Sequence, residues 1–225
     1  MKPSPFVHHA PRSVDEAVAV LAEVGHDGKV LAGGQSLIPI LNMRLAAPAH
    51  LVDINRVSGL GDVEVTQDAV RIGALVRHAQ LERHEGAHAA LPLLRQALLN
   101  VAHPVIRNRG TTVGSIAHAD PSGEMPAVLA LLDGHVEVAS ARGTRQIASA
   151  DFFLGPLESS LAEDEMAVGA FHIARAMAPA DLRRRADAAG GTMISLGERE
   201  GDYGDADGID DLYQDQPGGP DLRRR

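Results

Sequence analysis

Two glycine-containing loops have residue types and spacing that suit a phosphate group. The first is Ala32-Gly33-Gly34-Gln35-Ser36, and its two glycines directly follow the short predicted strand at 29–32. Two glycines at the end of a strand let backbone N–H groups approach a ligand, and Ser36 adds a hydroxyl. A tight turn made of turn-prone residues explains the same pattern. The residue types alone leave both interpretations open.

The second loop runs from Arg107 to Glu124 and again combines Gly, Ser and Thr with apolar flanks. Arg107 or Arg109 could offset phosphate charge, while Asp120 and Glu124 could accept hydrogen bonds from ribose hydroxyls. The alternative is a polar surface loop in which Asp120 or Ser122 acts as a cap. Two such loops favour a dinucleotide ligand, because each can hold a pyrophosphate from one side.

One motif suggests a different chemistry, that of zinc peptidases. His84-Glu85-Gly86-Ala87-His88 matches the H-E-x-x-H pattern. Zinc peptidases need both histidines on one face of a continuous helix. Gly86 inside the motif and Pro92 soon after it predict a loop instead, following a helix that ends near Arg83. We therefore predict no metal site, and we name no catalytic acid, base or nucleophile.

Composition excludes several classes of function. The 225 residues carry a formal net charge of −9, which argues against a broad basic surface for nucleic acid. Cysteine is absent, so this chain alone holds no disulfide, thiolate zinc site or iron–sulfur cluster. No apolar run approaches the roughly 20 residues that span a bilayer, and the N-terminus lacks the apolar stretch of a secretory signal. A soluble cytoplasmic protein without a membrane span is the expectation.

Three segments follow from the periodicity of the sequence. We predict a small α/β unit for residues 1–56. Ser13 and Glu16 have the spacing of a helix capping box, and Gly25 suits the end of that helix. Residues 57–168 predict a second, α+β unit. Residues 169–225 contain no valine and lack clear periodicity, so we expect a poorly ordered tail with a short helix near 170–177.

The individual elements are predicted from hydrophobic spacing and turn residues. The first unit is predicted to hold a helix after Ser13, strands at 29–32 and 51–54, and a short buried helix at 37–41. The second is predicted to hold a hairpin at 63–65 and 70–72, helices at 77–84, 91–99 and 124–132, and strands at 135–139 and 143–147.

Beyond these patterns, seven separate stretches in register resemble the FAD-binding medium subunit of the molybdenum hydroxylases. This family includes xanthine dehydrogenase and the aerobic carbon monoxide dehydrogenases. The resemblance covers residues 1 to about 168. The stretches are 29–37, 44–45 with 51–54, 72–75, 91–94, 106–111, 117–121 and 151–155.

The resemblance implies an α+β fold, a two-lobed FAD-binding domain of the vanillyl-alcohol-oxidase/PCMH type, with FAD held non-covalently between the lobes. By resemblance, the backbone of 32–36 and 111–115 binds the pyrophosphate, Glu124 contacts the adenosine side and Met166 makes an apolar contact. The cofactor-binding residues expected in this way are Ala32, Gly33, Gly34, Gln35, Ser36, Leu37, Thr111, Thr112, Val113, Gly114, Ser115, Asp120, Glu124 and Met166.

The family also implies a role in electron transfer. Such a subunit takes electrons from iron–sulfur clusters and passes them through FAD to an external acceptor. The molybdenum cofactor and the clusters would lie in a large and a small partner subunit, which agrees with a chain that lacks cysteine. Two alternatives stay open: a stand-alone flavin oxidoreductase, and a cofactor-free remnant that acts only as a binding or scaffold protein.

Two departures from the family pattern stand out. Val113 occupies the position of the first glycine of a Gly-Gly pair in the second loop. If that position needs a positive φ, a β-branched residue costs about 1–3 kcal/mol, and weaker FAD binding is expected. Family members also end in a third, α+β lobe that residues 169–225 do not resemble. We therefore expect this lobe to be missing or replaced.

Overall fold

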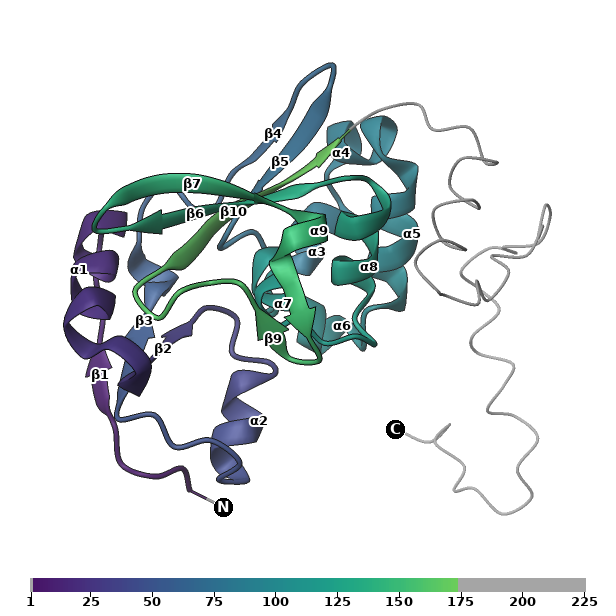
Figure 1. Cartoon of the computed structure of the whole chain (residues 1–225). Helices are drawn as coiled ribbons and strands as arrows, with labels where there is room; N and C mark the ends of the chain where they lie inside the picture. The colour runs from purple at the N-terminus through teal and green to yellow at the C-terminus, as the bar shows by residue number, and fades with distance from the viewer. Residues whose placement is uncertain (1, 174–225) are drawn as a thin grey trace, which may run out of the picture. The chain divides into compact units, whose positions relative to one another are not determined.

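The computed structural model describes residues 2–173, and Figure 1 shows how their helices and strands are arranged. The first part of the chain forms a three-stranded parallel sheet with strand order β1-β3-β2. The predicted succession of strand, helix and strand is confirmed. Its elements are β1 (Val7–His9), α1 (Val14–Val24), β2 (Gly28–Leu31), α2 (Leu37–Asn42) and β3 (His50–Asp53), with single 3-10 turns at Gly25–Asp27 and Ile54–Arg56.

The two ends of α1 follow from its sequence. The Ser13 hydroxyl accepts a hydrogen bond from the Glu16 N–H at 3.1 Å. The Glu16 carboxylate reaches back to the N–H of Arg12 at 2.7 Å. At the other end, Gly25 adopts a φ of 52° that stops the helix. The predicted helix and both of its caps are confirmed.

A five-stranded antiparallel sheet follows, with strand order β4-β5-β10-β6-β7. Helices α3 to α8 gather on one side of it (Figure 1), and α7 contacts both β5 and β10. The strands are β4 (Val63–Val65), β5 (Ala69–Gly73), β6 (His135–Ser140), β7 (Gly143–Ala148) and β10 (Met166–Ile173). The helices are α3 (His78–Glu82), α4 (Glu85–Ala90), α5 (Pro92–Asn100), α6 (Pro104–Arg107), α7 (Thr112–His118), α8 (Glu124–Leu131) and α9 (Ser149–Phe152), and a small hairpin is made by β8 (Phe153–Gly155) and β9 (Glu158–Ser159).

Both sheets contribute to one hydrophobic core. Helix α1 packs against β6 of the larger sheet, and its Ala17, Val18 and Leu21 are buried in the shared cluster. Phe152 and Met125 are among the largest side chains buried there. The shared core holds the two sheets in a fixed relation, so loops from both can form one site.

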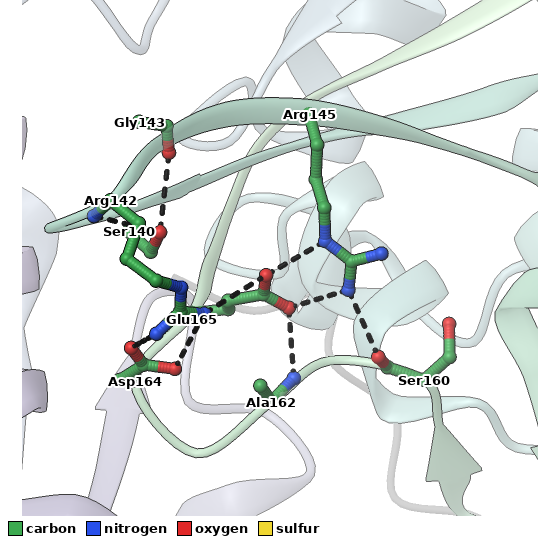
Figure 2. A network of polar contacts seen from close by, with 8 residues as sticks. All are labelled: Ser140, Arg142, Gly143, Arg145, Ser160, Ala162, Asp164 and Glu165. Carbon is green, nitrogen blue, oxygen red and sulfur yellow. Dashed lines mark hydrogen bonds and ion pairs between the residues drawn. The ribbon is translucent and has the colours of Figure 1, made fainter.

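A cluster of charged side chains ties the β6–β7 hairpin to the segment that enters β10 (Figure 2). The Glu165 carboxylate is 4% exposed and accepts hydrogen bonds from Nε and Nη2 of Arg145, both at 2.7 Å. The N–H of Ala162 donates to it at 2.9 Å, and Arg142 pairs with Asp164 beside it. Hydrogen bonds from Arg145 lower the pKa of Glu165, although burial works in the opposite direction.

Three predictions about the elements are wrong. Residues 170–173 belong to the central strand β10 rather than to a short helix, while the predicted positions 174–177 and the rest of the tail lie outside the described residues. Residues 85–90 form helix α4 rather than a loop, because His84 provides a cap for the first turn. Helix α2 was expected to be buried, yet Leu41 is its one buried residue.

Candidate functional site

The first predicted loop leaves β2 and turns sharply before α2. Gly34 has a φ of 71°, in the left-handed region where side chains are strained. Its carbonyl accepts from the N–H of Ile38 at 3.0 Å, which closes the turn. Within the described part of the chain, the N–H groups of residues 33–36 make no hydrogen bond. They are free to bind an acceptor from outside the protein.

The backbone of Gly33 lies directly against the second loop. A Cβ at this position would fall 2.5 Å from the carbonyl oxygen of Arg109, 2.8 Å from Gly110 Cα and 3.0 Å from the nitrogen of Thr111. Such distances are too short for any side chain, so the contact requires glycine. The structure thus brings the two loops together, although about 75 residues separate them in the sequence.

Several polar groups of the second loop form hydrogen bonds with other groups of the protein. The Thr111 hydroxyl caps α7 by accepting from the N–H of Gly114 at 3.1 Å. The N–H of Thr112 donates to the carbonyl of Val76, and that of Ser115 donates to the carbonyl of Thr111. Residues 111–113 are buried. Most of the polar groups of this loop therefore bond within the protein, and the loop supports the first one.

An open cavity of about 400 Å³ lies beside the Gly33–Gly34 turn. Arg109 lines it, and its guanidinium makes no ion pair with any residue of 2–173. Four of the predicted binding residues line the cavity, and the others do not. The lining residues are Leu31, Ala32, Gly33, Gly34, Gln35, Ile38, Pro39, Asp53, Asn55, Ile106 and Arg109.

A polar network supports the cavity wall: Asp53 and Asn55 belong to the lining, and Arg77 lies outside it. The Asn55 side chain donates to the carbonyl of Ala32 at 2.8 Å and accepts from Arg77 Nη2 at 2.6 Å. Arg77 Nη1 donates to the carbonyl of Arg109 at 2.8 Å. Burial and the charge of Arg109 lower the pKa of Arg77, while the charge of Asp53 offsets part of the effect.

Asp53 contributes the negative charge of this network. Its Oδ1 accepts from the Asn55 N–H at 3.0 Å and from the Asn55 side chain at 2.7 Å, while Oδ2 lies 3.2 Å from His8 Nε2. Burial raises the pKa of Asp53, but the hydrogen bonds from Asn55 and His8 outweigh it and leave the pKa below its usual value. Both carboxylate oxygens are therefore occupied inside the protein.

The donor set at the cavity fits an anionic group such as phosphate. Gly33, Gly34 and Gln35 line the cavity, and their N–H groups, which have no partner within the described residues, carry partial positive charge. Arg109 adds a full charge that is not neutralised within the described residues. Phosphate oxygens accept hydrogen bonds from both kinds of donor.

The remaining predicted residues lie in several places. Ser36 precedes the first residue of α2, Leu37, directly after the loop. Asp120 accepts from the N–H of Ser122 at 2.8 Å, which is the local turn that the surface-loop alternative describes, and Glu124 begins α8. Met166 is 1% exposed in the core. The ligand contacts proposed for Ser36, Leu37, Asp120, Glu124 and Met166 stay predictions.

The strain expected at Val113 is absent. Val113 lies in the first turn of α7, is 2% exposed, and is not among the residues with positive φ. Its side chain packs into the shared core and does not line the cavity. The position therefore accommodates valine without the left-handed backbone that the sequence argument assumed.

Two further sequence motifs are clarified by the structure. His84 Nδ1 accepts from the N–H of Ala87 at 3.0 Å, so it serves as a helix cap. No cluster of three or more His, Asp or Glu among residues 2–173 is arranged to hold a metal ion. Arg107 bonds to Glu82 at 2.9 Å and to two carbonyls, so of the two candidate arginines only Arg109 reaches the cavity. None of the helices in residues 2–173 has the length and apolar character needed to cross a bilayer.

Sequence reasoning missed Asp53, Asn55 and Arg77. Asp53 and Asn55 were visible as polar residues at the carboxyl end of the predicted strand at 51–54, a place where site residues often lie. No local signal marked Arg77, because its role depends on contacts with residues 22 and 32 positions away.

Comparison with known proteins decides the family. The family described as the FAD binding domain in molybdopterin dehydrogenase matches residues 4–173. The chain belongs to this family. The FAD-binding, two-lobed α+β fold predicted from the sequence is thereby confirmed, and FAD is the cofactor of the domain. The free N–H groups of 33–36 and Arg109 fit its pyrophosphate.

Relatives of this FAD-binding domain are subunits of larger enzymes. The chain is 44% identical over 168 residues to the 6-hydroxypseudooxynicotine dehydrogenase complex subunit alpha of Paenarthrobacter nicotinovorans, covering 75% of this chain and 57% of the relative. It is 41% identical over 168 residues to the carbon monoxide dehydrogenase medium chain of Hydrogenophaga pseudoflava, covering 75% and 58%. The chain thus spans less than two thirds of the length of these relatives.

Solved structures give the same result. A carbon monoxide dehydrogenase from Hydrogenophaga pseudoflava, which lacks the Mo-pyranopterin moiety, matches with a TM-score of 0.76 at 41% identity, covering 78% of this chain and 61% of that one. Quinoline 2-oxidoreductase from Pseudomonas putida 86 matches with a TM-score of 0.76 at 37% identity, with the same coverage.

Proposed function

We propose that this chain is the FAD-binding electron-transfer subunit of a molybdenum-containing hydroxylase or dehydrogenase. It receives electrons from iron–sulfur clusters in a small partner subunit and delivers them to an external acceptor, while a large partner subunit carries the molybdenum cofactor. The observation that carries the proposal is the set of free N–H groups at 33–36 facing Arg109 in a chain of this family.

The residues of the chain supply binding and orientation. The N–H groups of residues 33–36 and the Arg109 guanidinium hold the pyrophosphate. Asp53 and Asn55 line the same cavity, and Arg77 supports it from behind. FAD, when bound, supplies the one- and two-electron redox chemistry. It is held without a covalent link, since the chain has no cysteine and no histidine that matches a flavin attachment site.

The division of labour between subunits has support in composition. Iron–sulfur clusters are held mainly by cysteine thiolates, and this chain contains none. The clusters therefore belong to another chain. The printed names of the relatives, a complex subunit and a medium chain, agree with a multi-subunit enzyme.

Co-expression tests this proposal. The tagged full chain is expressed with the molybdenum and iron–sulfur subunits of the same organism, and substrate-dependent reduction of a dye acceptor is measured. We expect a three-subunit complex whose dye reduction falls when Arg109→Glu removes FAD. A complex that works equally well without FAD would favour the scaffold alternative. Flavin-dependent oxidation of a small substrate by the chain alone would favour the stand-alone oxidoreductase.

A further inference from the structure

The side-chain amide of Asn55 is fixed in one orientation by its neighbours. Its Nδ2 faces two acceptors, the Ala32 carbonyl at 2.8 Å and Asp53 Oδ1 at 2.7 Å. Its Oδ1 faces a group that only donates, Arg77 Nη2 at 2.6 Å. A flipped amide would set like groups against each other on both sides. Asn55 therefore fixes the position of Arg77 relative to the Ala32 carbonyl, where the first loop begins.

Arg77 joins this amide to the second loop. Its Nη1 donates to the Arg109 carbonyl at 2.8 Å, the same oxygen against which the Gly33 backbone packs. Its backbone forms an isolated bridge with Thr111. The planar guanidinium thus links the two loops with two donors: Nη1 bonds to the second loop, and Nη2 reaches the first through Asn55. A single ammonium group cannot reproduce this geometry.

The charge of Arg77 has no carboxylate in direct contact. Within the described residues it makes no ion pair, its hydrogen bonds go to a carbonyl and an amide, and the neighbouring charge of Arg109 repels it. The arginine is therefore held by geometry rather than by an acidic partner. Its position on the inner side of the cavity wall separates it from a ligand, since it does not line the cavity.

We infer that Asn55 and Arg77 are positioning residues, a brace that holds the backbone of residues 32–36 against that of residues 109–111 and so fixes the wall of the cavity in which the pyrophosphate binds. The inference rests on the proposed function, in which FAD occupies this site. The Asn55–Arg77 brace acts through the Ala32 and Arg109 carbonyls. Arg77 does not line the cavity, and Asn55, which does, already uses both ends of its amide within the protein.

Two variants separate geometry from charge. Asn55→Asp keeps the size and the acceptor for Arg77, but sets an oxygen against the Ala32 carbonyl and a carboxylate beside Asp53. Arg77→Lys keeps the positive charge and loses the two-pronged donor. Arg71→Lys is the matched control, because Arg71 makes comparable hydrogen bonds to Glu137 and Glu64 on the five-stranded sheet and does not line the cavity.

The first measurement is the FAD dissociation constant of the full chain and each variant, by flavin fluorescence. We expect Asn55→Asp and Arg77→Lys each to raise it about tenfold or more, and Arg71→Lys to leave it within about twofold. If Arg77→Lys binds FAD as tightly as the wild type, charge alone matters and the brace is refuted. Unchanged binding by Asn55→Asp refutes it as well.

A second measurement decides the brace independently of FAD. Amide hydrogen exchange is followed in the ligand-free chain at Ile38 and Ile40, whose N–H groups bond to the carbonyls of Gly34 and Ser36 in the first loop. The brace predicts exchange about fivefold faster in both variants than in the Arg71→Lys control. Equal exchange rates contradict it. A wild type that binds no FAD refutes the proposed function, and exchange then decides the brace alone.

Discussion

At the scale of single residues, Gly33 determines how closely the two loops approach. We expect Gly33→Ala to weaken FAD binding about tenfold or more, because its Cβ would lie 2.5 Å from the Arg109 carbonyl and push the loops apart. Gly61→Ala is the control, since a Cβ there meets no atom within 4 Å. Flavin fluorescence titration measures both. Equal dissociation constants for the two variants would show that the loop contact does not shape the site.

Val113 leads to a second prediction at this scale, opposite to the one its sequence suggests. Val113→Gly should lower the free energy of unfolding by about 2–4 kcal/mol, because it removes a core side chain and places glycine in a helix. Ala127→Gly on the exposed face of α8 calibrates the helix part of this cost. Urea unfolding measures both. Tighter FAD binding by Val113→Gly would restore the strain interpretation.

The site contains residues with a local sequence signal and residues without one. Gly33, Gly34 and Arg109 were visible as candidates because glycine after a strand and arginine in a polar loop have local meaning. Asn55 and Arg77 were not, since their partners lie far away in the sequence. The sequence also did not show that the N–H groups of Thr112 and Ser115 form hydrogen bonds within the protein. Those bonds depend on where Val76 and the α7 cap lie in the fold.

At the scale of elements, His78 links α3 to the start of α7. It is 3% exposed, and its Nδ1 lies 3.2 Å from the Thr112 hydroxyl. Burial and the charge of Arg107 lower its pKa from 6.5 to about 4. Between pH 6.5 and 4, His78 is protonated in the unfolded chain and neutral in the folded chain. The contribution of neutral His78 is therefore complete above pH 6.5 and is lost as the pH falls to 4.

The corresponding prediction concerns the pH dependence of stability. The unfolding free energy of the wild type falls as the pH drops from 6.5 to 4. In His78→Gln this fall should be smaller, by up to about 3 kcal/mol. Part of the loss should remain, since buried His172 also has a pKa lowered to about 4. Urea unfolding across this range measures it, with exposed His26→Gln as the control. An unchanged pH dependence in His78→Gln would contradict a neutral buried imidazole.

The charged cluster of Figure 2 leads to the second prediction at the scale of elements. Glu165→Gln should cost about 1–3 kcal/mol, because buried Glu165 accepts from Arg145 and Ala162. Glu64→Gln, whose side chain is 61% exposed, should cost little. Thermal and urea unfolding provide the comparison. If the two variants are equally stable, Glu165 does not hold the segment before β10 in place.

Elements with local signals were the ones that sequence reasoning predicted well. The α1 caps, the hairpins and the strands at 28–31 and 50–53 follow from capping residues and alternation. β10 was missed, and the second unit was ended at 168, because the loss of valine after that point hid a strand made largely of Gly, Ala, Phe and His. α4 was missed because a glycine inside a six-residue helix reads as a loop.

At the scale of the whole molecule, the shared core explains how two sheets build one site. α1 packs against β6, so the Gly33–Gly34 turn and the 109–111 backbone meet at a fixed place. The chain spans 57% of the 6-hydroxypseudooxynicotine dehydrogenase subunit. We therefore expect residues 2–173 to carry a complete site for the FAD pyrophosphate.

Flavin content tests this claim most directly. The full chain is expressed alone and purified, and any flavin released on denaturation is identified by chromatography and quantified against protein. We expect about one FAD per chain, either as purified or after reconstitution with added FAD. A folded chain that stays colourless and takes up no FAD would contradict it.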